Sequence, residues 1–399
     1  MTDLTAVTES DAFEAARRII HDSDATTVSH MCEATRIAAP TGSEAERGRW
    51  LAARFRELSL EPRVDDAGNV IAVSPAAERE TPRVVLASHL DTVFAAGTAL
   101  DIIRDGVRIS APGISDNSRG LAGLLAVARA LAGAGWPTRA PIAFVGTVGE
   151  EGAGDLRGAK HYMERNGAGT AAFIALDGAG STRIIHAGVG SRRLRVTFRG
   201  PGGHSWSDFG RPNAVHTAGR AVTALTALPL PADPRTTLTV ARIGGGTSIN
   251  TIPAEAWLEL DLRSEERRPL AEIEARVRAV LDRTAADESS ADDVISCDTA
   301  VFGDRPPGAT AASDPLVRVA EAATRAIGLE PQLAGSSTDA NIAMSIGIPA
   351  IAVGSGGTAG GTHTLGEWYE NEGGAHGIER VLLIVLATAG LAQPPDHRP

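Results

Sequence analysis

The sequence is poor in cysteine. Only Cys32 and Cys297 occur among 399 residues, and no Cys-x-x-Cys motif is present. A disulfide framework and a thiolate zinc site both require clusters of cysteines. Both are therefore excluded, and we expect two reduced, mostly buried thiols.

Excess positive charge is also absent. Lys and Arg total 38 against 49 Asp and Glu, a net charge of −11. Proteins that bind nucleic acids or anionic membranes usually carry a basic surface, so we expect neither partner. There is no apolar run of about 18 residues, the length that spans a bilayer, and no basic segment followed by an apolar stretch that would mark a signal peptide. We therefore expect a soluble, cytoplasmic protein.

Short apolar runs alternate with glycine-rich turns and helical stretches through most of the chain. Residues 11–60 have helical spacing with a break at Pro40–Gly42, and a further helix is expected at 121–135. Strands are expected at 84–88, 141–148, 171–176 and 349–355. Continuous apolar strands that alternate with helices predict an α/β fold, a mostly parallel sheet with helices on both faces.

The pattern changes between residues 189 and 304. Apolar and polar residues alternate there, as in a sheet with one solvated face. The expected order is strand, helix, strand, strand, helix, strand, which is typical of a ferredoxin-like α+β domain. A length of 399 residues suits about two domains. We therefore predict one domain from 1–188 and 305–399, with 189–304 inserted in it.

Charged and imidazole side chains follow the expected strands. They are His89 and Asp91, Glu150 and Glu151, Asp177 and His363, and Asp116 precedes the helix at 121–135. In open α/β sheets, ligands bind outside the carboxyl ends of the strands. We therefore expect these residues, which are spread over most of the chain, to meet at one edge of the sheet.

Two imidazoles and several carboxylates in one cleft favour a pair of metal ions. Like charges that close would otherwise shift their pKa values strongly, and imidazole and carboxylate are standard zinc ligands. Taken singly, each residue has an ordinary explanation. Asp116 suits a helix N-cap, Glu150–Glu151 a solvated acidic pair and Asp177 a turn. The joint pattern is what predicts a centre with two metals.

The sequence resembles the co-catalytic di-zinc peptidase family that includes peptidase T, glutamate carboxypeptidase, aminoacylase and succinyl-diaminopimelate desuccinylase. The resemblance covers nearly the whole chain, from about residue 11 to 390. The motifs that carry it are SHLDTV, GISDNSRG, VGEEG, GPGGHS, GGTSINTIP, LDLR, SSTDAN and GGTHTLGEW. The resemblance implies a zinc-dependent metallohydrolase with two divalent ions per chain. Zn(II) is expected, and Co(II) or Mn(II) can substitute at such sites.

The resemblance also implies a role for each residue of the centre. His89 and Asp177 would bind one metal, Glu151 and His363 the other, and Asp116 would bridge both. Glu150 would be the general base that takes a proton from a metal-bridged water. Asp91 would orient His89, and a cis peptide is expected between Asp116 and Asn117.

The inserted segment would be a lid and dimerisation domain of a homodimer. His204 would reach the neighbouring subunit's site and stabilise the oxyanion. Asn250 and Arg263 would bind the substrate, the arginine through a carboxylate. Ser337 and Thr338, with Asp339, would line the pocket, and Glu367 would support His363 or only fix its loop.

Two hypotheses for the substrate are consistent with the sequence. The first is a small peptide, cleaved by a peptidase T-like aminopeptidase or dipeptidase, which an aspartate at position 177 favours. The second is an N-acyl amino acid. The bridging motif Asp-Asn-Ser-Arg-Gly also departs from the Asp-x-Lys-Gly-Gly of many members, which leaves the subfamily open. A third reading is a non-catalytic binding protein on the same fold.

Overall fold

A computed structural model describes residues 3–392 of the chain. Its contacts form two compact units, one of Met1–Gly188 with Ala309–Pro399 and the other of Val189–Gly308. These bounds lie close to the predicted insertion at 189–304, and the role of the insertion as a lid and dimerisation domain stays a prediction. No helix in the described part of the chain has both the length and the apolar composition needed to cross a bilayer.

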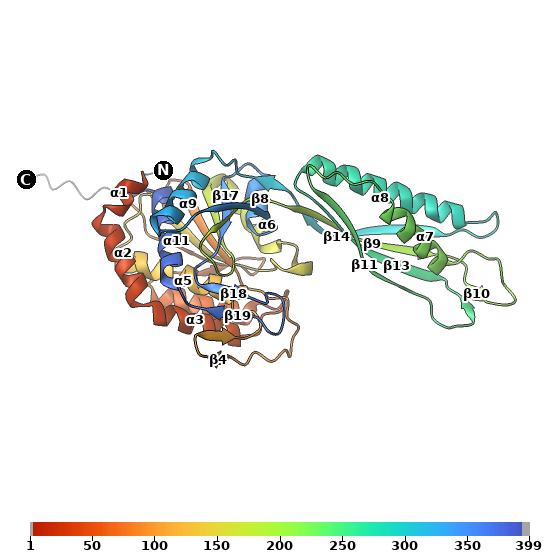
Figure 1. Ribbon diagram of the computed structural model, residues 1–399, viewed down its shortest axis with the longest axis horizontal. Helices are drawn as coiled ribbons and strands as arrows, with labels where there is room; N and C mark the ends of the chain where they lie inside the picture. The colour runs from red at the N-terminus through yellow and green to blue at the C-terminus, as the bar shows by residue number, and fades with distance from the viewer. Residues whose placement is uncertain (1–2, 393–399) are drawn as a thin grey trace, which may run out of the picture. The chain divides into compact units, whose positions relative to one another are not determined.

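The first unit is built on a large, mostly parallel sheet (Figure 1). Neighbours β6, β3, β7 and β17 run parallel, whereas β1 and β2 are antiparallel at one edge. The strands, in spatial order, are β1 (Arg63–Val64), β2 (Val70–Val73), β6 (Ile142–Thr147), β3 (Arg83–His89), β7 (Thr170–Leu176), β17 (Ala350–Val353), β8 (Arg183–Gly188) and β15 (Gly308–Ala309), with β16 (Gln332–Ser336) also pairing with β8. The four predicted strands correspond to β3, β6, β7 and β17.

Helices cover both faces of this sheet. One face carries α1 (Leu4–Thr8), α2 (Asp11–Asp22), α4 (Ala45–Glu57), α5 (Ser118–Gly133), α9 (Pro315–Ala326) and α11 (Gly374–Ala389). The other carries α6 (Arg157–Asn166) and α10 (Ala340–Ser345). Because successive side chains of a strand point to opposite faces, a strand buried on both faces is apolar throughout. The predicted α/β architecture is confirmed.

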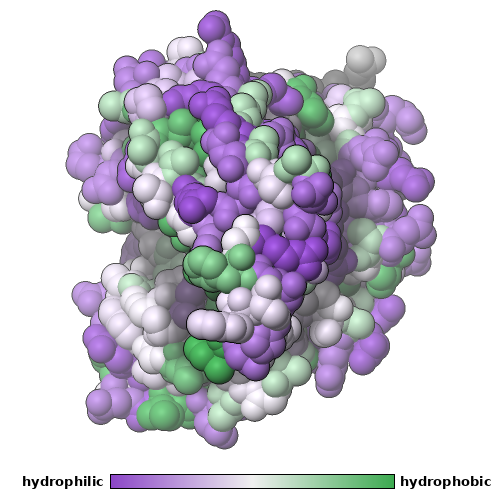
Figure 2. All heavy atoms as spheres, turned by 90° about the vertical axis from the view of Figure 1, so that its right-hand side faces the viewer, coloured by the Kyte–Doolittle hydropathy of each residue, from purple (hydrophilic) through white to green (hydrophobic). Residues whose placement is uncertain are grey.

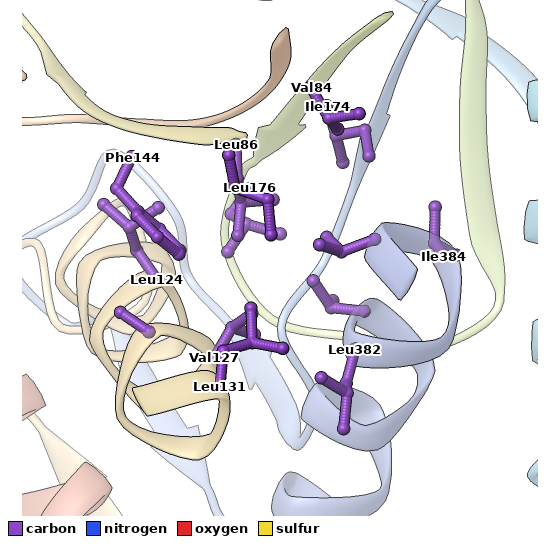
Figure 3. Packing of buried hydrophobic residues seen from close by; sticks show 14 of the residues in the cluster. Val84, Leu86, Leu124, Val127, Leu131, Phe144, Ile174, Leu176, Leu382 and Ile384 are labelled. Atoms are coloured by element: carbon purple, nitrogen blue, oxygen red, sulfur yellow. The ribbon is translucent and has the colours of Figure 1, made fainter. Parts of the chain in front are cut away.

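The core between the sheet and helices α5 and α11 is aliphatic (Figure 3). Leu86 of β3 and Leu176 of β7 face Leu124 and Val127 of α5, and Leu382 of α11 closes the layer. All of these side chains are at most 2% exposed. Burying such a side chain contributes about 1.5–3 kcal/mol. This packing fixes the strand ends from which the polar residues of the site emerge.

A second, smaller antiparallel sheet lies in the same unit. It pairs β18 (Thr358–Gly360), β19 (Trp368–Glu370), β5 (Arg108–Ser110) and β4 (Ile103–Asp105) in that order. Its core is shared with α3 (Asp24–Arg36), through Met31 and Cys32. The pairing of β19 with β5 joins parts of the chain that are about 260 residues apart.

The second unit has the ferredoxin-like order expected from the sequence. Its sheet runs β11 (Thr236–Gly245), β13 (Glu255–Ser264), β9 (Gly190–Arg199), β14 (Ser296–Arg305), all antiparallel. Helices α7 (Ala214–Thr226) and α8 (Arg267–Glu288) pack on one face (Figure 1). Strands β10 (Gly203–His204) and β12 (Thr251–Ile252) form a separate short pair. Buried residues alternate with partly buried ones along most of β9 and β13, which reflects a single face covered by helices.

Candidate metal centre

Three neighbouring strands deliver polar side chains to one edge of the large sheet. β3 ends at His89, β6 is followed by Glu150 and Glu151, and β7 is followed directly by Asp177. The three strands are parallel neighbours in the order β6, β3, β7. Their carboxyl ends therefore meet, as expected from the sequence.

The small sheet brings two further residues to the same place. Asp116 lies in the loop after β5, and His363 lies in the loop between β18 and β19. Because β19 pairs with β5, with Trp368 opposite Ser110, the two loops lie side by side. His363 has a positive φ of 65°, a backbone conformation that is uncommon for residues other than glycine.

The side chains form two groups that share Asp116. His89 Nε2 lies 3.0 Å from Asp116 Oδ1 and 3.9 Å from Asp177 Oδ1. His363 Nε2 lies 3.0 Å from Asp116 Oδ2 and 2.9 Å from Glu151 Oε1. Asp116 thus presents a different oxygen to each histidine, the arrangement that a bridging carboxylate needs.

These donors fit a pair of divalent cations. Each group offers one imidazole nitrogen and two carboxylate oxygens within 4.8 Å of one another, namely His89, Asp116 and Asp177, and Asp116, Glu151 and His363. Three protein ligands with a position left open is the usual composition of a catalytic zinc site. The residues present therefore suit a pair of divalent metal ions. Their assignment as metal ligands stays a prediction.

Asp91 fixes both the histidine and the acidic pair. Its carboxylate accepts hydrogen bonds from the backbone N–H groups of Glu150 and Glu151, both at 2.9 Å, and from the Thr41 hydroxyl at 2.8 Å. His89 Nδ1 lies 3.1 Å from the Asp91 carbonyl oxygen and 3.5 Å from its carboxylate. Burial opposes ionisation, but His89 and these donors lower the pKa of Asp91 to about 2. The Asp91 carboxylate is thus anionic and lies where it can orient His89 and Glu150. Its hydrogen bond with Thr41 could not be predicted from the sequence.

Glu367 holds the loop that carries Asp116. Its buried carboxylate accepts hydrogen bonds from the backbone N–H groups of Gly113, Ser115 and Asp116, at 2.8–3.1 Å. The sequence suggests that Glu367 either supports His363 or fixes a loop. In the structure its carboxylate fixes a loop. The loop is that of Asp116 rather than that of His363.

The peptide bond between Asp116 and Asn117 is cis, as expected. Asn117 is also the N-cap of α5, because its side-chain oxygen accepts a hydrogen bond from the N–H of Gly120. Its amide nitrogen donates to the Leu176 carbonyl oxygen at 2.9 Å. Asn117 therefore ties the Asp116 loop to the end of β7, next to Asp177.

The surrounding carboxylates raise the pKa values of the two histidines. Burial lowers the pKa of His89, but hydrogen bonds with Asp116, Asp177 and Asp91 outweigh it and raise the pKa well above 6.5. The hydrogen bond with Asp116 is the main cause that raises the pKa of His363 to about 9. Without another cation, the carboxylates are neutralised by imidazolium groups.

We expect metal binding to release protons. Histidine binds a metal through a neutral nitrogen, so zinc added at pH 7.5 should displace up to about two protons per chain from His89 and His363. The apparent zinc affinity should rise with pH up to about 9, where His363 loses its proton. Calorimetry of zinc binding in buffers of different ionisation enthalpy measures this release. Tight binding without proton release at pH 7.5 would contradict the two histidine assignments.

Three residues of the predicted pocket lie around the N-terminus of α10. Asp339 is buried and accepts a hydrogen bond from the Thr147 hydroxyl at 2.5 Å, and burial raises its pKa to about 6. Thr338 is buried too, and its hydroxyl accepts from the N–H of Ala340 at 3.3 Å. The structure thus places Thr338 in a local cap. Substrate contact by Ser337 and Thr338 stays a prediction.

His204, Asn250 and Arg263 belong to the second unit. β10 pairs with β12, with His204 opposite Thr251, and the N–H of Ser205 donates to the Asn250 carbonyl at 3.0 Å. His204 and Asn250 are therefore neighbours. Arg263 is near the far end of β13, with its Nε 2.7 Å from Asp261 Oδ2. The structure does not bring it to His204, and its guanidinium already has a carboxylate partner.

Comparison with known proteins gives a consistent result. The sequence model of the peptidase family M20/M25/M40 matches residues 85–387. The chain is 29% identical over 261 residues to a succinyl-diaminopimelate desuccinylase of Corynebacterium glutamicum, covering 63% of this chain and 69% of that protein.

Two solved peptidase structures share the fold over most of the chain. The aminopeptidase PepT of Bacillus cereus superposes with a TM-score of 0.74 at 26% identity. A tripeptidase of Staphylococcus aureus superposes with a TM-score of 0.76 at 23% identity. Both alignments cover 91% of this chain and 98% of the other. The family resemblance expected from the motifs is confirmed.

Proposed function

This chain belongs to peptidase family M20/M25/M40, and from that membership we propose that it hydrolyses an amide bond in small peptides, as a peptidase T-like aminopeptidase or dipeptidase. The observation that carries the proposal is Asp116, whose two oxygens each face one histidine at 3.0 Å. Membership makes the chain a hydrolase, which leaves the non-catalytic reading without support.

The proposed centre holds two divalent cations, with zinc as the expected metal and Co(II) or Mn(II) as substitutes. His89 and Asp177 would hold one ion, Glu151 and His363 the other, and Asp116 both. When bound, such a pair polarises a carbonyl oxygen and lowers the pKa of a water.

Glu150 is the proposed general base. It is 6% exposed and follows β6 at the same edge as His89, and both lie in a group with Glu151 whose ligand atoms are within 4.8 Å. Its backbone N–H is fixed by Asp91. The Glu150 carboxylate would take a proton from the attacking water and give it to the leaving amine nitrogen. One residue then serves as base and as acid in turn.

His204 is the proposed oxyanion-stabilising residue. The N–H groups of Trp206 and Ser207 point at its Nδ1, at 3.2 and 3.4 Å. A ring nitrogen that accepts has no hydrogen, so the hydrogen of the neutral ring is on Nε2. The side chain is exposed. His204 therefore presents an N–H donor of the kind that binds a developing oxyanion.

We propose that the second unit mediates a homodimer and that His204 acts in the partner's site. Trp206 and Phe209 are 87% and 89% exposed, and Ile249 is fully exposed. Figure 2 shows hydrophobic residues among hydrophilic ones on the side that faces right in Figure 1. The N–H of Ser205 donates to the Asn250 carbonyl, so the segments that carry these apolar side chains are neighbours. A contiguous apolar patch in water is typical of an interaction surface, and closed two-fold dimers are the commonest assembly. A cytoplasmic location stays a prediction.

The alternative substrate is an N-acyl amino acid, and the similarity to a desuccinylase favours it. A hydrolysis screen decides between the two. Zinc-loaded protein is expected to cleave di- and tripeptides with a free amino group, and chelation should abolish the activity. N-acyl amino acids of varied acyl length form the second set. Turnover of only the second set would contradict the peptide proposal and support the alternative.

A further inference from the structure

A pocket of about 430 Å³ opens beside the candidate metal centre, within the first unit. Asp116 and Asp177 form part of its wall. Most of the remaining wall is glycine, alanine, serine and threonine, and the one basic residue that lines it is Arg183. The pocket therefore has carboxylates at the proposed metal ligands and a single cation of its own.

The backbone of Arg183 is firmly held. Arg183 begins β8, pairs with Gln332 of β16, and its carbonyl oxygen accepts a hydrogen bond from Nη2 of Arg380 at 3.0 Å. Arg380 itself is fully buried and donates to the Thr324 hydroxyl at 2.8 Å. The Cα atom from which the Arg183 side chain extends is thus held in place by the sheet and by Arg380.

Arg183 is the exposed first residue of β8, and its guanidinium forms no ion pair with a carboxylate of residues 3–392. Arginines of the second unit contrast with it. Arg263 lies 2.7 Å from Asp261 and Arg195 2.7 Å from Glu259. Asp116 and Asp177, which share the pocket, are the residues proposed to hold the metals. Arg183 is therefore exposed and available to an anion that enters the pocket.

The shape of the wall leaves room for such an anion. Gly178, Gly180 and Gly357 line it with φ values of 67°, 98° and 74°, which side chains rarely tolerate. A Cβ added at Gly180 would meet nothing within 4 Å. Space bounded by backbone, with one guanidinium, suits a short carboxylate group, since a guanidinium can donate two parallel hydrogen bonds to it.

We propose that Arg183 binds a carboxylate of the substrate in this pocket, so that the enzyme prefers substrates with a negative charge close to the scissile amide. The inference rests on the proposed function, because it places this pocket beside the reacting carbonyl. The carboxylate can belong to an acidic side chain, to the peptide C-terminus or to a dicarboxylic acyl group, and all three have the same chemistry.

Matched substrate pairs identify the source of the charge. They are Glu-Ala against Gln-Ala, Ala-Glu against Ala-Gln, Ala-Ala against its C-terminal amide, and succinyl-alanine against butyryl-alanine. In at least one pair, kcat/KM should favour the charged member. Arg183→Gln should reduce that preference by about 10- to 100-fold, the usual worth of hydrogen bonds to a charged group. Activity on the neutral member should stay near wild type.

Two further variants control the result. Arg183→Lys keeps the charge and should retain part of the preference. Arg139→Ala removes another exposed arginine of the first unit that is absent from the pocket wall and should change nothing. An unchanged preference in Arg183→Gln, or a loss equal for charged and neutral members, overturns the inference.

A binding measurement separates this inference from the proposed function. Calorimetry with zinc-loaded Glu150→Gln protein gives the dissociation constant of each pair without turnover. Introducing Arg183→Gln into this variant should weaken the binding of the charged member alone. The factor should be similar to the loss of preference in kcat/KM. If the wild-type protein hydrolyses none of these compounds, the proposed function fails, while the binding result still decides the role of Arg183.

Discussion

Glu150→Ala is expected to retain its metal content and to lose most of its turnover. The drop in kcat should be about 10²- to 10⁴-fold, the usual contribution of a general acid–base group. The reason is geometric. Glu150 and Glu151 are both held by Asp91, but only Glu151 lies at 2.9 Å from His363, in the group that shares Asp116. Glu150 lies outside the two groups that share Asp116, which supports its proposed role as the general base.

Steady-state kinetics and metal analysis on the same sample test this expectation. Glu150→Gln, which keeps the size of the side chain, should be as impaired as the alanine variant. Glu164→Ala, an exposed glutamate on α6, should behave like wild type. Near wild-type turnover in Glu150→Ala would show that another residue is the base. Loss of metal along with activity would instead make Glu150 a ligand.

His204→Ala is expected to lower kcat by about 10²- to 10³-fold, as removal of one oxyanion-hole donor does. Its metal content and the KM for the substrate should change little, because the donor acts on charge that develops in the transition state. The Nε2–H of His204 is free to do this, since Nδ1 is occupied by two backbone N–H groups.

Mixing the two inactive variants distinguishes action in the partner's site from action within one chain. In a hybrid dimer, the chain with His204→Ala keeps Glu150 and receives His204 from the chain with Glu150→Ala. An equal mixture of freely exchanging subunits should regain about one quarter of the wild-type activity, since half of the dimers are hybrids with one intact site in two. No recovery, together with a monomer in sedimentation, would contradict the shared-site proposal.

The convergence of the site could be predicted because it depends on the register of buried strands. β3, β6 and β7 each contain a continuous apolar run, so their positions and the polar residues that follow, His89, Glu150 and Asp177, can be located in the sequence. The ferredoxin-like order of the second unit could be predicted from another pattern, because apolar and polar residues alternate along much of β9 and β13.

Contacts made by irregular loops could not be predicted in this way. The bonds of Glu367 to three N–H groups, and of Asp91 to two, depend on loop conformations that have no periodicity. The role proposed for Arg183 could not be predicted either, because one arginine at the start of a strand resembles an ordinary surface charge. The role proposed for Arg183 depends on the pocket beside Asp177, which only the structure shows.

The proposed two-metal centre at His89, Asp116 and His363 should hydrolyse an amide bond only when it holds both ions. Adding zinc in steps to metal-depleted protein, while measuring hydrolysis of a free-amino dipeptide, tests it most directly. We predict that activity is absent without metal, rises with zinc and levels off at two equivalents per chain. Hydrolysis that is equally fast in the metal-depleted protein, or that reaches its plateau at one equivalent, would contradict the claim.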